Sequence, residues 1–90
     1  MDRHAASLDR AHRRALDWLS SLEHRPVPPQ ASIDQVVQAL GPALPPGGSD
    51  AAEVVDLLAE ACDPGLTAMP SGRFFGFVIG GTHPAALATD

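Results

Sequence analysis

Apolar residues recur at helical spacing through the first two-thirds of the chain. Between residues 4 and 24 they fall three and four positions apart, the period of one face of an α-helix. They are Leu8, Ala11, Ala15, Trp18 and Leu22, with Leu16 and Leu19 widening the stripe. The dipeptide Arg25-Pro26 predicts the end of this helix, because the residue before a proline avoids the helical region. The helix is expected to begin near Asp2 or, with Ser7 as N-cap, at Leu8.

Two further helices are predicted by capping boxes. In Ser32-Ile33-Asp34-Gln35 the serine hydroxyl can accept from the glutamine amide while the glutamine side chain reaches back. Gly41-Pro42 is expected to stop this helix. The sequence Asp50-Ala51-Ala52-Glu53 is a second box, and Asp63-Pro64-Gly65 ends the helix that it opens. Both helices have an apolar face. Their apolar residues are Ile33, Val36, Val37 and Leu40 in the first, and Val54, Val55, Leu57, Leu58, Ala61 and Cys62 in the second.

Proline-rich stretches join the helices. Residues 26–31 are expected to form an extended, semi-rigid connector that lies along a surface. Residues 42–48 are expected to form a loop. Three short helices on stiff connectors could pack on each other or lie along another surface. We favour the second arrangement, because so much of the chain is connector.

The pattern changes after Gly65. The run from Phe74 to Ile79 is apolar and aromatic, which predicts a buried extended segment, and glycines punctuate it. Thr82 as N-cap and Pro84 in the first turn then predict a new helix. No C-cap follows, so we expect a fragment of a longer protein. The predicted fold class is mainly α, with three short helices, an extended Phe/Gly-rich segment and a truncated helix start.

Composition limits the functions that this chain can carry. Ninety residues allow one small domain with a modest core. The net charge of −5 argues against a nucleic-acid partner. The first segment is locally basic. Its basic residues are Arg3, His4, Arg10, His12, Arg13 and Arg14. Aspartates interrupt them, which favours a solvated helix face over a phosphate-binding one.

The N-terminus and the cysteine count indicate a compartment. No apolar run follows the N-terminal arginines, so neither a signal peptide nor a membrane span is expected. The single Cys62 excludes an internal disulfide, and no cysteine pattern indicates a metal site. A reducing, cytoplasmic compartment is therefore expected. The chain contains no Lys, which excludes a lysine Schiff base within it.

Few residues suggest a chemical site. Gly76-x-x-x-Gly80-Gly81 before a helix start has part of the pattern of a phosphate loop, but the required Lys is missing, so close backbone packing is favoured. His83 could contact an anion, although a surface position or local cap is favoured. Arg73 could clamp a carboxylate or phosphate, while an ion pair or aromatic stacking is favoured. Cys62 is expected to be a buried small hydrophobe.

Residues 66–88 carry a resemblance to a known family. They read Leu-Thr-Ala-Met-Pro-Ser-Gly-Arg-Phe-Phe-Gly-Phe-Val-Ile-Gly-Gly-Thr-His-Pro-Ala-Ala-Leu-Ala. This stretch resembles the N-terminal region of group II pyridoxal-phosphate-dependent decarboxylases, the family of aromatic-L-amino-acid and glutamate decarboxylases. The matching positions are Phe74-Phe75, Phe77, Pro84 and Leu87-Ala88. Ser71-Gly72 stands where many relatives have His-Pro. The three preceding helices also resemble the N-terminal extension of that family.

The resemblance implies a role for each part of the chain. Residues 1–65 would be a helical extension that clamps a homodimer, and residues 66–90 would begin an α/β fold-type-I enzyme body. The implied cofactor is pyridoxal 5'-phosphate, with its Schiff-base lysine beyond residue 90, and the implied reaction is decarboxylation of an amino acid with the cofactor ring as electron sink. Phe77 and Val78 match positions that line the substrate pocket. Val78 replaces a bulkier residue, which leaves the substrate open and keeps an aminotransferase-like relative as an alternative.

A second interpretation belongs to another functional class. The chain would be a small helical protein-interaction module whose Phe-rich tail is a docking segment. Under either interpretation the 90 residues are expected to be inactive alone.

Overall fold

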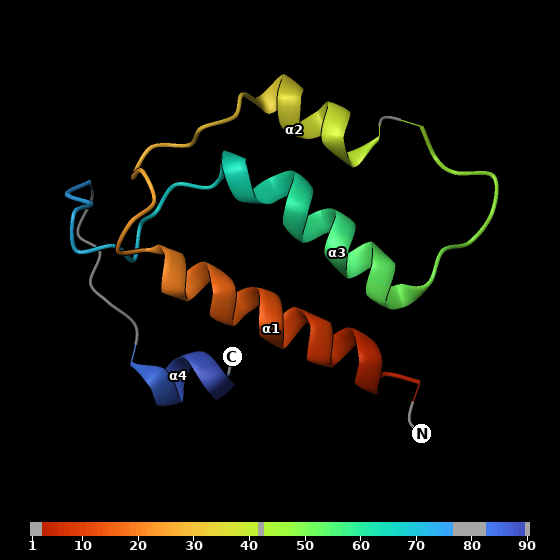
Figure 1. Cartoon of the computed structure of the whole chain (residues 1–90), viewed down its shortest axis with the longest axis horizontal. Helices are drawn as coiled ribbons and strands as arrows, with labels where there is room; N and C mark the ends of the chain where they lie inside the picture. Colours follow the sequence, from red (N-terminus) through yellow and green to blue (C-terminus); the bar gives the residue numbers. More distant parts are fainter. Residues whose placement is uncertain (1–2, 42, 77–82, 90) are drawn as a thin grey trace.

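Three helices lie side by side in one layer in the computed structural model of this chain (Figure 1). α3 is the middle helix and packs against α1 on one side and against α2 on the other. A 3₁₀ turn follows α3 directly, and a short fourth helix lies later in the chain. The bounds are α1 Ala5–Ser21, α2 Ile33–Leu40, α3 Ala51–Cys62, η1 Asp63–Gly65 and α4 Pro84–Thr89.

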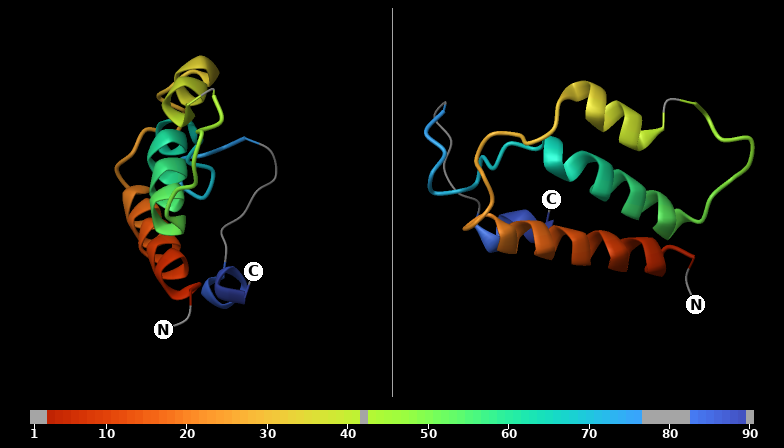
Figure 2. Two further views of the ribbon diagram at one scale, coloured as in Figure 1. Left: turned by 90° about the vertical axis from the view of Figure 1, so that its right-hand side faces the viewer. Right: turned by 45° about the horizontal axis from the view of Figure 1, so that its top comes forward.

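The structure describes residues 3–41, 43–76 and 83–89. These residues form helices, turns and connectors, with no strand among them, which confirms the prediction of a mainly α chain. α1 and α3 run in the same direction, and α2 runs in the opposite one (Figure 1). α4 lies outside the three-helix layer (Figure 2), and its described residues are all exposed.

Local sequence signals explain where α2 begins and ends. The Ser32 hydroxyl accepts from the Gln35 amide at 3.1 Å, and the Gln35 side chain accepts from the Ser32 amide at 2.8 Å. The predicted capping box is therefore confirmed. The helix ends at Leu40 because Gly41 adopts a φ of 85°, a left-handed conformation that glycine reaches without steric cost.

Two predicted helix starts are wrong in their capping residues. α1 begins at Ala5, so Ser7 already lies within its first turn, and the Ser7 hydroxyl donates to the His4 carbonyl at 3.1 Å. Ser7 is therefore not the N-cap. Asp50 does precede the first residue of α3, but its side chain makes no capping hydrogen bond. The second capping box is thus absent, although the helix starts where that box placed it.

The C-terminal end of α1 is close to the predicted one. The helix stops at Ser21 and continues as turns to Arg25, whose amide donates to the Ser21 carbonyl at 2.8 Å. Pro26 then prevents a further helical turn. The last helix begins at Pro84, so this proline lies in the first turn as predicted, where it suits the first helical position. The predicted N-cap, Thr82, lies outside the described residues.

The buried core of the described residues is thin. Its buried members are Ala52, Ala61, Ala68 and Ser71. These side chains are small, and many larger apolar side chains stay exposed. The exposed ones include Leu8, Leu16, Ile33, Leu44, Val54, Leu57, Leu58, Met69, Phe75 and Leu87. The helices pack on each other, because α3 contacts both α1 and α2, so the arrangement that we favoured above is not the one observed within this chain. A single layer nevertheless cannot cover both of its faces.

The Phe-rich segment departs from the prediction of a buried extended strand. Phe75 is 91% exposed and Phe74 is half-buried, in a stretch without regular structure. The prediction of burial is wrong for Phe75, because none of the described elements lies over it. Phe77, Val78 and Ile79 fall outside the described residues.

Candidate functional site

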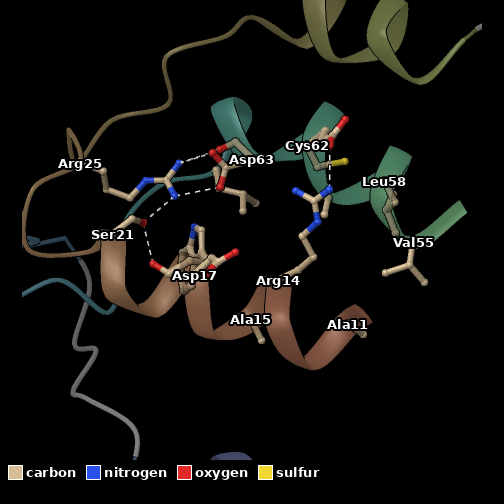
Figure 3. A pocket seen from close by; sticks show the side chains of 14 residues that line it. Ala11, Arg14, Ala15, Asp17, Ser21, Arg25, Val55, Leu58, Cys62 and Asp63 are labelled. Carbon is tan, nitrogen blue, oxygen red and sulfur yellow. Dashed lines mark hydrogen bonds and ion pairs between the residues drawn. The ribbon is translucent and has the colours of Figure 1, made fainter. Parts of the chain in front are cut away.

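A groove of about 840 Å³ runs between α1 and α3 (Figure 3). Small or apolar side chains from both helices form much of its surface, and charged side chains stand at its edges. The apolar residues are Ala11, Ala15 and Trp18 from α1, Val55, Leu58, Ala59 and Cys62 from α3, and Leu66 beyond η1. Three of these lining residues are alanines, whose small side chains fill less of the space between the helices than larger ones would.

Arg25 closes one end of this groove. Its guanidinium binds the Asp63 carboxylate with both nitrogens, Nη1 to Oδ1 at 3.0 Å and Nη2 to Oδ2 at 3.1 Å. Nη2 also donates to the Asp63 carbonyl at 2.9 Å, and Nη1 to the Ser21 hydroxyl at 3.1 Å. The same cation lies 5.8 Å from the centre of the Trp18 ring. Arg25 therefore ties the end of α1 to the end of α3.

Trp18 lies beneath that cation with its polar atom buried. The indole Nε1 has no hydrogen-bond partner among the described residues. A buried indole N–H usually finds a partner, so this one carries a desolvation cost. The residue contributes area and a cation–π contact rather than a hydrogen bond.

An ion-pair network joins α1 and α3 along the groove. The Arg14 guanidinium donates to Asp56 Oδ1 from Nε at 3.1 Å and from Nη2 at 3.0 Å, and to Glu60 Oε1 at 2.7 Å. Arg10 pairs with the other oxygen of Asp56. The hydrogen bonds from Arg14 to Glu60, and then to Asp56, raise the pKa of Arg14 above its usual range.

A smaller hollow of about 330 Å³ lies between α2 and the end of α3. Its lining includes Ile33, Val36 and Val37 of α2. Cys62 and Leu66 line this hollow and the larger groove alike. The two hollows therefore share part of their lining, and between them they are lined by apolar residues of all three helices of the layer. We call this apolar lining the helical face.

The Pro-rich connector lies along residues 64–68, as the prediction of a surface connector required. The Gln30 and Ala31 amides donate to the Pro64 carbonyl at 2.7 and 2.8 Å. The Ala68 amide donates back to the Val27 carbonyl at 2.9 Å. The two segments thus run antiparallel, and they attach the chain after Gly65 to the helical layer.

The residues singled out in the sequence are placed as follows. Phe77 and Val78, the proposed pocket residues, lie outside the described residues, as do Gly80 and Gly81. His83 is a local cap, as favoured: its Nδ1 accepts from the Ala85 amide at 3.1 Å. Cys62 is half-buried between the two hollows, so full burial was wrong.

Arg73 has a structural role, but not one of those favoured. Among the described residues it forms neither of the expected contacts and instead donates from Nη2 to the carbonyls of Leu22 and Arg25, at 2.8 and 2.7 Å. The prediction of a solvated basic face is wrong for Arg10 and Arg14, because both side chains pair with carboxylates of α3. Arg13 pairs with Asp9 one turn away at 3.1 Å.

The inter-helix ion pairs were missed by the sequence analysis. A signal for them exists: Arg10 and Arg14 are four residues apart, and so are Asp56 and Glu60. Each pair lies on one face of its helix. Opposite charges at matching spacing on two helices are compatible with pairing, although the spacing alone does not say which helices are neighbours.

The arrangement of the groove suits packing against another surface. An apolar surface edged by satisfied ion pairs accepts apolar side chains from another surface. The described part of the chain holds no cluster of three or more His, Cys, Asp or Glu side chains fit for a metal ion. Across that same part, every helix is too short or too polar to cross a membrane. No family model, no curated protein and no solved structure matches this sequence.

Proposed function

We propose that this chain is the N-terminal portion of a pyridoxal-phosphate-dependent amino-acid decarboxylase. Residues 1–65 would clamp the partner subunit of a homodimer, and residues 66–90 would begin an enzyme body of fold type I. The observation that carries the proposal is the resemblance of residues 66–88 to group II decarboxylases, joined to a helical extension that cannot cover its own apolar face.

The exposed surface supports a role within a larger assembly. The helical face is open, the buried residues are few and small, and Phe75 is 91% exposed. Covering one large apolar side chain contributes roughly 1.5–3 kcal/mol. A subunit surface that buried several of these side chains would stabilise the layer strongly.

The donor set of this chain fits a supporting role toward the cofactor. The chain has no Lys for covalent attachment. The guanidinium groups of Arg10, Arg14 and Arg25 are engaged with carboxylates, so these arginines are not poised for a phosphate. Attachment of pyridoxal phosphate, which supplies an electron sink when bound, would fall to residues outside these 90. This chain would supply dimer contacts and, through Phe77 and Val78, pocket wall.

A second candidate function is favoured by the same open surface. The chain would then be a helical interaction module that docks on an unrelated protein through its Phe-rich tail, in which Phe75 is 91% exposed. The two candidates differ in what accompanies the chain. The decarboxylase requires an enzyme body in the same polypeptide, whereas the module does not.

The coding sequence after codon 90 and the cofactor chemistry of its product test the proposal together. We expect an open frame of several hundred codons containing a Ser/Asn-x-His-Lys motif. Its purified product, incubated with pyridoxal phosphate and then borohydride, should carry a stable adduct on that lysine. The same product with the lysine replaced by Arg is the matched control and should carry none. A frame without such a motif, or a product that never retains the cofactor, would contradict the proposal.

A further inference from the structure

Arg73 joins two parts of the chain that are far apart in sequence. Its Nη2 donates to the Leu22 carbonyl at 2.8 Å and to the Arg25 carbonyl at 2.7 Å. Both carbonyls lie just past the end of α1, where backbone acceptors lack helical partners and the helix dipole is negative. A guanidinium matches this end in both charge and hydrogen bonding.

The chain before Arg73 is rooted on the same region. Ala68 is 0% exposed, and its amide binds the Val27 carbonyl. The Ser71 amide then donates to the Ala68 carbonyl at 3.1 Å. Residues 68–73 are thus fixed at one end by the Ala68 backbone and at the other by the Arg73 side chain. Both anchors lie on residues 22–27.

The turn itself is closed by Ser71, which is buried. Its hydroxyl accepts from the Arg73 amide at 3.1 Å, and its carbonyl accepts from the Phe74 amide at 3.2 Å. The chain then leaves the turn in a set direction. The Phe74 ring lies so close to Gly76 that a Cβ on Gly76 would come within 2.6 Å of it. Gly76 therefore leaves room for the ring, while Phe75 stays outside.

We infer that Arg73 is a latch that couples the placement of Phe74 and Phe75 to the C-terminal end of α1. This inference goes beyond the proposed function and holds for the enzyme portion and the interaction module alike. When the latch is closed, Arg73 is bound to the Leu22 and Arg25 carbonyls, and the helical layer forms one unit with the aromatic segment, by which we mean Phe74 and Phe75. When it is open, the aromatic segment moves independently while the three helices keep their contacts.

The aromatic composition of the chain permits a selective test. Its three Phe residues are Phe74, Phe75 and Phe77, and its one Trp is Trp18. Fluorine NMR of the 90-residue chain carrying fluorophenylalanine, kept folded by trimethylamine oxide and dilute enough to limit self-association, therefore reports only on the segment after Arg73. Fluorotryptophan reports only on the groove. Single Phe→Leu substitutions assign the three phenylalanine signals.

The variants are Arg73→Gln, which removes the cation, and Arg73→Lys, which keeps the charge but not the planar fork. Arg13→Gln is the matched control, because Arg13 is 70% exposed and pairs only with Asp9 among the interactions described. We expect Arg73→Gln to move the Phe74 signal to the position of the unfolded chain while the Trp18 signal stays. Amide exchange at residues 73 and 74 should rise about tenfold, as for the loss of one charge-assisted hydrogen bond.

Rescue and failure are both defined. Arg73→Lys should give an intermediate shift, and Arg13→Gln should give none. An unchanged Phe74 signal in Arg73→Gln would overturn the latch. A Trp18 signal that moves to the position of the unfolded chain, together with loss of helical circular dichroism, would also overturn the latch. Arg73 would then hold the whole fold rather than only the segment with Phe74 and Phe75. None of these outcomes depends on a cofactor, so failure of the latch and failure of the decarboxylase proposal are distinguishable.

Discussion

Replacing Arg25 by Met should release the end of α1 from the end of α3. The Arg25 side chain is only 14% exposed, and Asp63 is 50% exposed. The substitution keeps most of the aliphatic stem and removes the two-pronged pair with the carboxylate, the bond to the Asp63 carbonyl and the cation over Trp18. Each of these contacts has a typical magnitude, so the loss can be estimated.

The magnitude follows from the exposure of the partners. Asp63 is half in water, so it is solvated once its partner is gone, and the pair contributes about 1–2 kcal/mol rather than the larger value of a buried pair. The backbone hydrogen bond adds about 1 kcal/mol and the cation–π contact about 0.5 kcal/mol. We therefore expect Arg25→Met to lower the free energy of unfolding by about 2.5–3.5 kcal/mol. Arg25→Lys should lose about half of that, because it keeps the charge but not the fork.

The assay is urea unfolding followed by Trp18 fluorescence and by helical circular dichroism. An osmolyte such as trimethylamine oxide keeps the weaker variants folded. Asp63→Asn and the double variant complete a cycle that isolates the pair. We expect the losses of unfolding free energy in the two single variants, added together, to exceed the loss in the double variant by about 1 kcal/mol. Strict additivity, or unchanged Trp18 emission in Arg25→Met, would refute the reasoning.

Four further outcomes follow from the same account. Gly65→Ala should destabilise the chain by about 1–3 kcal/mol in urea unfolding, because the new Cβ would lie 2.7 Å from a methyl group of Val36. The added substitution Val36→Ala should restore much of this loss. If it restores none of the loss, the clash is not the cause. The chain alone should be weakly folded, and sedimentation should show that it self-associates as its concentration rises. Phe75→Ser should reduce this association. A sharp melting transition of a monomer would disprove the prediction. The chain alone should form no borohydride-stable side-chain adduct with pyridoxal phosphate, since it has no Lys; mass spectrometry decides this. In the full-length decarboxylase proposed above, Phe77→Ala should change the relative kcat/KM values of different amino-acid substrates by roughly 10–200-fold, the effect of one pocket contact. A uniform loss of activity with a lower Tm would mean that Phe77 belongs to the core of the fold instead.

Local sequence rules predicted where the helices lie, but they predicted the capping residues less well. The capping box at Ser32 and the helix end at Gly41 depend only on residues within a few positions along the chain, so both could be predicted from the sequence. Asp50 satisfies the same local pattern without making the bond. The start of α1 at Ala5 has no capping side chain to mark it, and the sequence rules require one.

Contacts between elements could not be predicted in the same way. The pairing of Arg14 with Asp56, and of Arg73 with the end of α1, joins residues more than 40 positions apart. Spacing within one helix shows which side chains share a face, but not which helix lies opposite. The aromatic run around Phe75 was expected to be buried because the pattern records apolar character, while burial depends on whether another element covers the residue.

Release of carbon dioxide from carboxyl-labelled amino acids tests the central claim most directly. The protein expressed from the complete reading frame that contains this chain is incubated with pyridoxal phosphate and a panel of aromatic, acidic and aliphatic amino acids. The account predicts labelled carbon dioxide and the matching amine in equal amounts from at least one of them, and loss of both products, together with loss of the dimer, when residues 1–65 are deleted. A protein that releases no carbon dioxide from any of them, or one that keeps its dimer and its full activity without residues 1–65, would contradict the account.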